Sequence, residues 1–309
     1  MNLKPGSTDA ISLVEKFDAR SCALGEGPLW HPERQQLFWF DIIGKRLLSQ
    51  VAGRALSWDF NEPVSAAAWT SRDELLIASQ SQLMLFNLET GLAQHLCPLE
   101  AHNPTTRSND GRADPWGGFW IGTMGLEAQA GAGALYRYFE GRLVQIRANM
   151  TIPNAICFSP DGRYVYFTDT PSACIYRQAL DGQGWPKGSI ENFIDLSEDL
   201  SQGRPRCNPD GAVVDANGNL WNAHWGASHV SVYNPNGIRQ STYTFPAVHT
   251  SCPAFGGADL STLYVTSATQ GLRAPDADQG CTFALAVQAR GQREHRVVIV
   301  APTLQNRRV

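Results

Sequence analysis

Charged residues are scarce in this 309-residue sequence, because Lys, Arg, Asp and Glu together make up only 17% of it. The formal net charge is −4 and the basic residues form no cluster, so no surface is predicted that could follow a nucleic-acid backbone. No apolar run approaches the ~18 residues that span a bilayer, and segment 1–10 has no apolar signal core. We therefore expect a cytoplasmic protein that binds neither nucleic acid nor membranes.

Paired cysteines and several catalytic motifs are also missing. The seven cysteines are scattered, with no C-x-x-C pair, which predicts reduced, mostly buried thiols. The absence of G-x-S-x-G excludes an α/β-hydrolase, and the absence of G-x-G-x-x-G and of a P-loop leaves nucleotide binding unsupported. The cysteines are Cys22, Cys97, Cys157, Cys174, Cys207, Cys252 and Cys281.

Glycine, proline and aromatic residues, by contrast, are abundant, which favours short strands joined by tight turns. One motif recurs six times: small or apolar residues, a polar turn, then an aromatic or aliphatic strand. Successive copies start 39 to 56 residues apart, an interval that suits one four-stranded propeller blade per copy. The copies are GPLWHPERQQLFWFD (27–41), AAAWTSRDELLIAS (66–79), GRADPWGGFWIGT (111–123), AICFSPDGRYVYFTD (155–169), GAVVDANGNLWNAH (211–224) and PAFGGADLSTLYVTS (253–267).

The six predicted hairpins indicate an all-β fold, a six-bladed β-propeller with a central channel. No linker interrupts the pattern, so we expect a single propeller domain over residues 1–309. Segments 11–17 and 295–301 lie where they could pair to close the ring. The tryptophans, Trp225 included, are expected mainly in the blade cores, although Trp225 ends an outgoing strand and the channel mouth is its alternative. A β-sandwich with irregular hairpins is the alternative interpretation of the repeat.

Polar residues recur at one position just before each predicted inner strand. Because the innermost strands of a propeller line its channel, these residues are predicted to form a ring at one height. The ring contains two carboxylates and two amides but no thiol or imidazole. Its members are Glu26, Ser65, Asn109, Asn154, Asp210 and Ser251.

Oxygen donors of this kind suit a hard cation, with Ca²⁺ first and Mg²⁺ or Mn²⁺ behind it. Two carboxylates in a narrow channel repel each other unless one is protonated or a cation lies between them. A polar lining around a water-filled channel accounts for the same residues without a metal. Both interpretations stay open on the ring alone.

Five segments resemble the gluconolactonase, senescence-marker-protein-30 and luciferin-regenerating-enzyme family. The resemblance extends over about residues 20–290 with the motifs in the family's order, and it implies a six-bladed propeller with a metal ion at the channel mouth. The segments are GEGPLW (25–30), RSNDGRADPWGGFWIGTM (107–124), IPNAICFSPDGRYVYFTDT (152–170), NPDGAVVDANGNLW (208–221) and FGGADLSTLYVTSA (255–268).

The resemblance also implies roles for individual residues. The metal ligands are expected to be Glu26, Asn154 and Asp210, with Ca²⁺ as the first choice of ion and Zn²⁺, Mn²⁺ or Mg²⁺ as alternatives. Arg107, Asn109 and Glu127 are expected to contact the substrate, Glu127 on the basis of spacing alone. Segment 183–207 receives no assigned contacts.

The implied activity is metal-dependent hydrolysis of a sugar (aldono-) lactone, such as glucono-1,5-lactone, to the open-chain sugar acid. Asp210 is expected to act as general base as well as ligand. The implied partner is the small-molecule lactone, and the protein is expected as a monomer or small homo-oligomer. The alternatives are a phosphotriesterase or other esterase that uses the same metal, or a non-catalytic propeller that binds a ligand.

Overall fold

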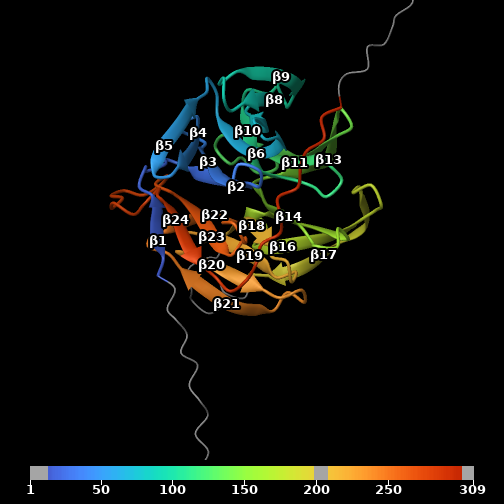
Figure 1. Ribbon diagram of the computed structural model, residues 1–309. Helices are drawn as coiled ribbons and strands as arrows, with labels where there is room; N and C mark the ends of the chain where they lie inside the picture. Colours follow the sequence, from blue (N-terminus) through green and yellow to red (C-terminus); the bar gives the residue numbers. More distant parts are fainter. Residues whose placement is uncertain (1–12, 198–207, 301–309) are drawn as a thin grey trace, which may run out of the picture.

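The structure is a computed structural model that describes residues 13–197 and 208–300. Its strands form six four-stranded sheets, which are arranged as blades around a common centre (Figure 1). The predicted all-β, six-bladed propeller is therefore confirmed. Within the described ranges the only helix is the 3-10 turn η1 (Thr170–Ser172).

Each of the first three blades runs from an innermost to an outermost strand in chain order. Blade 1 contains β2 (Gly25–His31), β3 (Gln36–Asp41), β4 (Arg46–Val51) and β5 (Arg54–Asp59). Blade 2 contains β6 (Val64–Ser71), β7 (Glu74–Ser79), β8 (Gln82–Asn87) and β9 (Ala93–Pro98). Blade 3 contains β10 (Thr106–Ala113), β11 (Phe119–Gly125), β12 (Gly133–Phe139) and β13 (Arg142–Met150).

The remaining blades follow the same order, except at the last strand. Blade 4 contains β14 (Pro153–Phe158), β15 (Tyr164–Asp169), β16 (Cys174–Leu180) and β17 (Pro186–Asp195). Blade 5 contains β18 (Asn208–Val214), β19 (Leu220–Trp225), β20 (His229–Tyr233) and β21 (Arg239–Thr244). Blade 6 contains β22 (His249–Gly256), β23 (Thr262–Ala268), β24 (Thr282–Ala286) and, as its outermost strand, β1 (Glu15–Asp18).

Ring closure agrees only in part with its prediction. Strand β1, from segment 11–17, does close the ring, but it pairs antiparallel with β24, so the predicted pairing with segment 295–301 is wrong. Residues 295–300 contain no strand. There the backbone N–H groups of Val297 and Val298 donate to the carbonyls of Trp69 and Gly117. Residues 11, 12 and 301 lie outside the described ranges.

Apolar residues fill the spaces between blades. Six buried clusters occur, one between each pair of neighbouring blades. Trp39 and Trp120 are among the largest fully buried side chains. The six described cysteines are free thiols, five of them buried, as the sequence predicts; Cys207 lies outside the described ranges, as does the end of segment 183–207, whose earlier part forms β17.

The innermost strands are bulged near their starts, where the predicted ring lies. A bulge bends a strand and re-aims its side chains. Glycine allows these strands to approach closely: a Cβ on Gly27 would lie 2.3 Å from the carbonyl oxygen of Ser65, and one on Gly211 would lie 2.3 Å from Sγ of Cys252. The convergence of the strands explains the glycines that follow Glu26 and Asp210.

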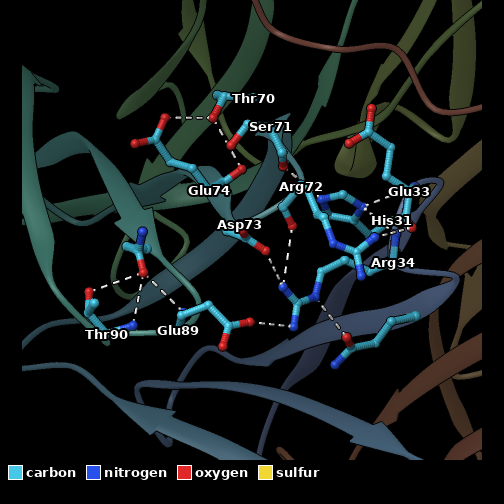
Figure 2. A network of polar contacts seen from close by, with 12 residues as sticks. His31, Glu33, Arg34, Thr70, Ser71, Arg72, Asp73, Glu74, Glu89 and Thr90 are labelled. Atoms are coloured by element: carbon cyan, nitrogen blue, oxygen red, sulfur yellow. Dashed lines mark hydrogen bonds and ion pairs between the residues drawn. The ribbon is translucent and has the colours of Figure 1, made fainter.

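The hairpin turns of blades 1 and 2 are joined at the opposite end of the inner strands. The Arg34 guanidinium lies between Asp73, at 2.7 Å, and Glu89, at 2.9 Å (Figure 2). The buried His31 ring accepts hydrogen bonds at Nδ1 from the backbone N–H groups of Glu33 and Arg34. These contacts fix the turn of blade 1 and link it to blade 2, far from the predicted ring.

Candidate active site

A cavity of about 550 Å³ opens at the end of the channel where the innermost strands begin. All six residues predicted as metal ligands or substrate contacts contribute to its lining. The lining residues are Leu24, Glu26, Arg107, Asn109, Met124, Leu126, Glu127, Ala128, Ile152, Asn154, Thr170, Pro171, Asn208, Asp210, Trp225, His249, Gln270 and Gly271.

Glu26, Asn154 and Asp210 come together in this cavity from three different blades. They lie on the innermost strands β2, β14 and β18, and each side chain is less than a tenth exposed. Residues far apart in the sequence meet here because the innermost strands converge on the channel. The structure thus brings together the three residues that the sequence marked as candidate ligands.

Two members of the predicted ring do not line the cavity. The Ser65 hydroxyl donates to the carbonyl of Asn109 at 2.6 Å, and the Ser251 hydroxyl donates to the carbonyl of Gly25 at 2.5 Å. Bulged strands leave backbone carbonyls that need donors, and these short hydroxyls supply them across neighbouring blades. The prediction that Ser65 and Ser251 face the channel is therefore wrong; both join blades.

A chain of hydrogen bonds crosses the site from blade 3 to blade 5. Arg107 Nη1 donates to Asn109 Oδ1 at 2.9 Å, and Asn109 Nδ2 donates to Asn154 Oδ1 at 2.8 Å. Asn154 Nδ2 donates to Thr170 Oγ1 at 3.0 Å, and that hydroxyl donates to the carbonyl of Pro209 at 2.8 Å. Pro209 precedes Asp210, so the chain links two candidate ligands and two candidate substrate contacts.

The two amides keep limited capacity for a ligand. Asn109 Nδ2 donates to the carbonyl of Pro153 as well as to Asn154, so both of its N–H groups are used within the protein. Oδ1 of each amide accepts one of these bonds, and an amide oxygen has two lone pairs. Asn109 can therefore accept a substrate hydroxyl, and Asn154 can offer its oxygen to a cation.

Buried charge dominates the electrostatics of the site. Burial raises the pKa of Glu26 to about 8; repulsion from Asp110 adds to this, while the Gly27 N–H and Arg107 act against it. Burial likewise raises the pKa of Asp210 well above its ordinary value, with repulsion from Glu26 and Asp110 contributing. Burial lowers the pKa of Arg107 to about 10, against the attraction of Glu26 and Asp210. The cavity floor thus concentrates carboxylates that resist ionisation.

A hard cation fits these donors. Glu26, Asp210 and Asn154 offer only oxygen atoms, the ligands that Ca²⁺ and Mg²⁺ prefer. A cation between the two carboxylates would replace their mutual repulsion with attraction. Within residues 13–197 and 208–300 no three His, Cys, Asp or Glu side chains are grouped so that they could hold a metal ion. The third oxygen donor at this site is the amide of Asn154.

The rim of the cavity has one acidic and one aromatic side. Glu127 lies exposed in the turn after β11, where its spacing in the sequence suggested. Trp225, at the end of β19, stacks on His249, at the start of β22, with ring centroids 4.3 Å apart and planes 15° apart. Trp225 therefore lines the channel mouth, the alternative to its expected place in the blade core.

Sequence reasoning missed several residues that line the cavity, Thr170, Asn208 and His249 among them, and the nearby buried carboxylate of Asp110. Thr170 follows a repeat strand in the short turn η1, which has no counterpart in the other copies. Asn208 stands in the quoted NPDG segment, but it precedes the aligned position. His249 precedes its repeat copy, and Asp110 follows Asn109 directly. The NPDG and SNDG segments were the available signals for Asn208 and Asp110; Thr170 and His249 had none.

These features define a six-bladed propeller with a buried carboxylate–amide site at one end of its channel. The chain belongs to the SMP-30/gluconolactonase/LRE-like family, whose characteristic region matches residues 24–269.

Similar proteins agree with this assignment. A Rhizobium meliloti (strain 1021) protein, provisionally named a sugar lactone lactonase, is 42% identical over 278 residues, 88% of this chain and 92% of that protein. The 6-deoxy-6-sulfogluconolactonase of Pseudomonas putida is 33% identical and covers 87% of this chain and 92% of its own. A crystal structure described as a calcium-binding protein, regucalcin, from Agrobacterium tumefaciens str. C58 superposes with a TM-score of 0.88 at 37% identity, covering 94% of this chain and 98% of that one.

Across the described part of the chain, no helix has the length and apolar character that crossing a membrane requires.

Proposed function

We propose that this protein hydrolyses a sugar lactone, such as glucono-1,5-lactone, to the open-chain sugar acid with the help of one divalent cation. The protein is a lactonase, a carboxylic ester hydrolase, as its family and the names of its relatives indicate. The observation that carries the proposal is the meeting of Glu26, Asn154 and Asp210 on the floor of one cavity. A cavity of about 550 Å³ is of the size that holds a small-molecule ligand.

The cation is proposed as Ca²⁺, with Zn²⁺, Mn²⁺ and Mg²⁺ as alternatives. Glu26, Asn154 and Asp210 would hold it, since all three offer oxygen donors in a buried site. The description of the Agrobacterium relative as calcium-binding supports this choice. When bound, such an ion polarises an ester carbonyl and lowers the pKa of a nearby water.

The side chains of the protein transfer the proton, stabilise the oxyanion and orient the lactone. Asp210 takes the proton of the attacking water. A bound cation would lower the pKa of this carboxylate, so the effect of the cation on the water would share the work. The Arg107 guanidinium, fixed by Asn109, offers positive charge to the oxyanion that develops on the carbonyl oxygen. Asn109 Oδ1 and Glu127 accept hydrogen bonds from ring hydroxyls and so orient the lactone.

The test follows acid release from glucono-1,5-lactone by chelator-stripped protein as Ca²⁺, Mg²⁺, Mn²⁺ or Zn²⁺ is added back, with spontaneous opening subtracted. We expect metal to restore turnover, and Asp210→Asn to lower kcat at least about 100-fold because it removes the base. Asp161→Asn, in an exposed hairpin turn, is the control and should behave as wild type.

Two outcomes would overturn the proposal. Wild-type turnover by Asp210→Asn at saturating metal would remove the assigned base. Hydrolysis of an organophosphate without any lactone turnover would instead favour a phosphotriesterase that uses the same site.

A further inference from the structure

The two sides of the cavity differ in chemistry. Blade 3 contributes the polar groups Arg107, Asn109 and Glu127 beside the apolar Met124, Leu126 and Ala128. The aromatic lining residues, Trp225 and His249, come from blades 5 and 6. In a ring of six blades, blade 6 lies opposite blade 3. A ligand between these sides therefore meets hydrogen-bonding groups on one side and an aromatic wall, the Trp225–His249 pair, on the other.

The aromatic wall is held firmly in place. Trp225 pairs across the blade with Asn208, two residues before Asp210, and its indole also packs against the apolar cluster between blades 1 and 2. His249 covers it with nearly parallel planes 15° apart. Because packing fixes both rings, little conformational freedom remains to be lost when a ligand binds.

A sugar ring has hydroxyl groups around its edge and C–H bonds on its faces. These two kinds of surface match the hydrogen-bonding groups and the aromatic wall of the cavity. An aromatic face carries partial negative charge and attracts such C–H groups, while it also removes apolar surface from water. We propose that Trp225 is a specificity-determining residue that packs against the C–H face of the lactone ring while blade 3 binds its hydroxyls. This inference rests on the proposed lactonase activity and adds the recognition of the ring face.

The contact between Trp225 and the lactone ring would be the same in the bound substrate and in the transition state. Its loss should therefore weaken substrate binding rather than slow the chemical step. We expect Trp225→Ala to raise KM for glucono-1,5-lactone about tenfold, the effect of losing roughly 1.4 kcal/mol, with kcat changed less than about twofold. Trp225→Phe, which keeps an aromatic face, should recover most of the affinity. The inhibition constant of gluconate should rise in parallel with KM, because the acid retains much of the C–H surface.

Trp58→Ala is the matched control. Trp58 packs partly buried against the same apolar cluster, but it lies on the outer strand β5 and does not line the cavity. A general loss of packing would appear in both variants, whereas loss of a substrate contact would appear only in Trp225→Ala. The thermal midpoint and the Ca²⁺ dissociation constant are measured for each variant to separate the two effects.

The outcomes distinguish this inference from the function on which it rests. If wild type turns over lactone and Trp225→Ala is folded but keeps its KM and gluconate inhibition, the aromatic contact is refuted and the lactonase assignment stands. An equal rise of KM in Trp58→Ala would likewise refute it. If wild type shows no lactone turnover with any metal, the proposed function itself fails.

Discussion

Thr170 connects two of the candidate metal ligands through a single hydroxyl. That hydroxyl accepts from Asn154 Nδ2 and donates to the carbonyl of Pro209, the residue before Asp210. The first bond requires the Asn154 amide to turn its nitrogen to Thr170, which leaves its oxygen for Asn109 and for a cation. We therefore infer that Thr170 is a positioning residue, which acts on the proposed cation site through Asn154 and the backbone of blade 5.

Thr170→Val should weaken Ca²⁺ binding by about tenfold, the lower end of the range for lost outer-shell hydrogen bonds. Valine has nearly the same shape but leaves Asn154 Nδ2 and the Pro209 carbonyl without this partner, so the ligands lose orientation. Thr170→Ser keeps the hydroxyl and should bind like wild type. Calorimetric titration of chelator-stripped protein with Ca²⁺ measures the difference.

Thr168→Val is the control for that substitution. Its buried hydroxyl donates to the Cys174 carbonyl at 2.7 Å within the same blade, so its loss should affect stability without affecting Ca²⁺ affinity. Equal affinities of wild type and Thr170→Val would contradict the positioning role.

At the scale of strands, the repeat predicted the innermost hairpin of every blade. That success has a local cause, because each copy carries its own turn residues and its own apolar strands. Strand β1 had no such signal. It pairs with β24, with Lys16 opposite Phe283, and neither segment contains a motif that predicts the register of strands so far apart in the sequence. The direction of the Ser65 and Ser251 side chains could not be predicted either. A strand bulge redirects a side chain without changing the position of its residue in the aligned repeat copies.

The bulge in β14 shows how a strand irregularity serves the site. Ala155, directly after Asn154, has a left-handed backbone with φ of 57°, which costs energy in a residue with a side chain. The following N–H, of Ile156, donates to Asp110 Oδ2 of blade 3 at 2.8 Å. A carboxylate of one blade thus fixes the bulge of the next and sets the position of Asn154.

The contacts that join β1 to blade 1 can be tested at Arg20. Its guanidinium and backbone N–H donate to Asp18 of β1, and the same guanidinium donates to the carbonyls of Ser49 and Leu56 in blade 1. Arg20→Ala should lower the free energy of unfolding by about 2 kcal/mol, because these charge-assisted bonds are partly buried. Arg20→Lys should lose most of this as well, since an ammonium cannot reproduce the fork of donors.

Urea denaturation measures the Arg20 variants. Arg163→Ala, which removes an exposed ion pair with Asp161, should leave the midpoint unchanged. Arg20 variants as stable as wild type would show that the Arg20 contacts do not help to hold β1 against blade 1.

On the scale of the whole molecule, the segment after β24 crosses the channel end opposite the cavity, where it is drawn in red across the centre of the ring (Figure 1). It bonds to five blades in turn. The Gly291 N–H donates to Leu260 of blade 6, the Arg290 carbonyl accepts from Ala216 beyond blade 5, and Gln292 donates to Phe158 of blade 4 and Val214 of blade 5. At blades 2 and 3 it meets Trp69 and Gly117. These bonds tie the segment after β24 to the turns and strand ends of five blades.

Glu294 lies at the centre of that crossing and pairs with Arg112 of β10 at 2.5 Å, with both side chains nearly buried. Arg112 Nε is buried and has no hydrogen-bond partner among the described residues. The ion pair with Glu294 is therefore the main interaction that offsets the cost of removing the Arg112 charge from water. Glu294→Ala should lower the free energy of unfolding by about 3 to 5 kcal/mol, because it leaves that guanidinium buried and unpaired. The double variant Arg112→Met with Glu294→Leu should recover most of the loss, since it removes both charges together.

Urea denaturation of wild type, Glu294→Ala and the double variant measures these differences. The control is Glu191→Ala, which removes an exposed partner of Arg177 and should change the free energy of unfolding by less than about 0.5 kcal/mol. A double variant no more stable than Glu294→Ala would mean that the shape of this pair, rather than its charge balance, holds the crossing segment across the channel.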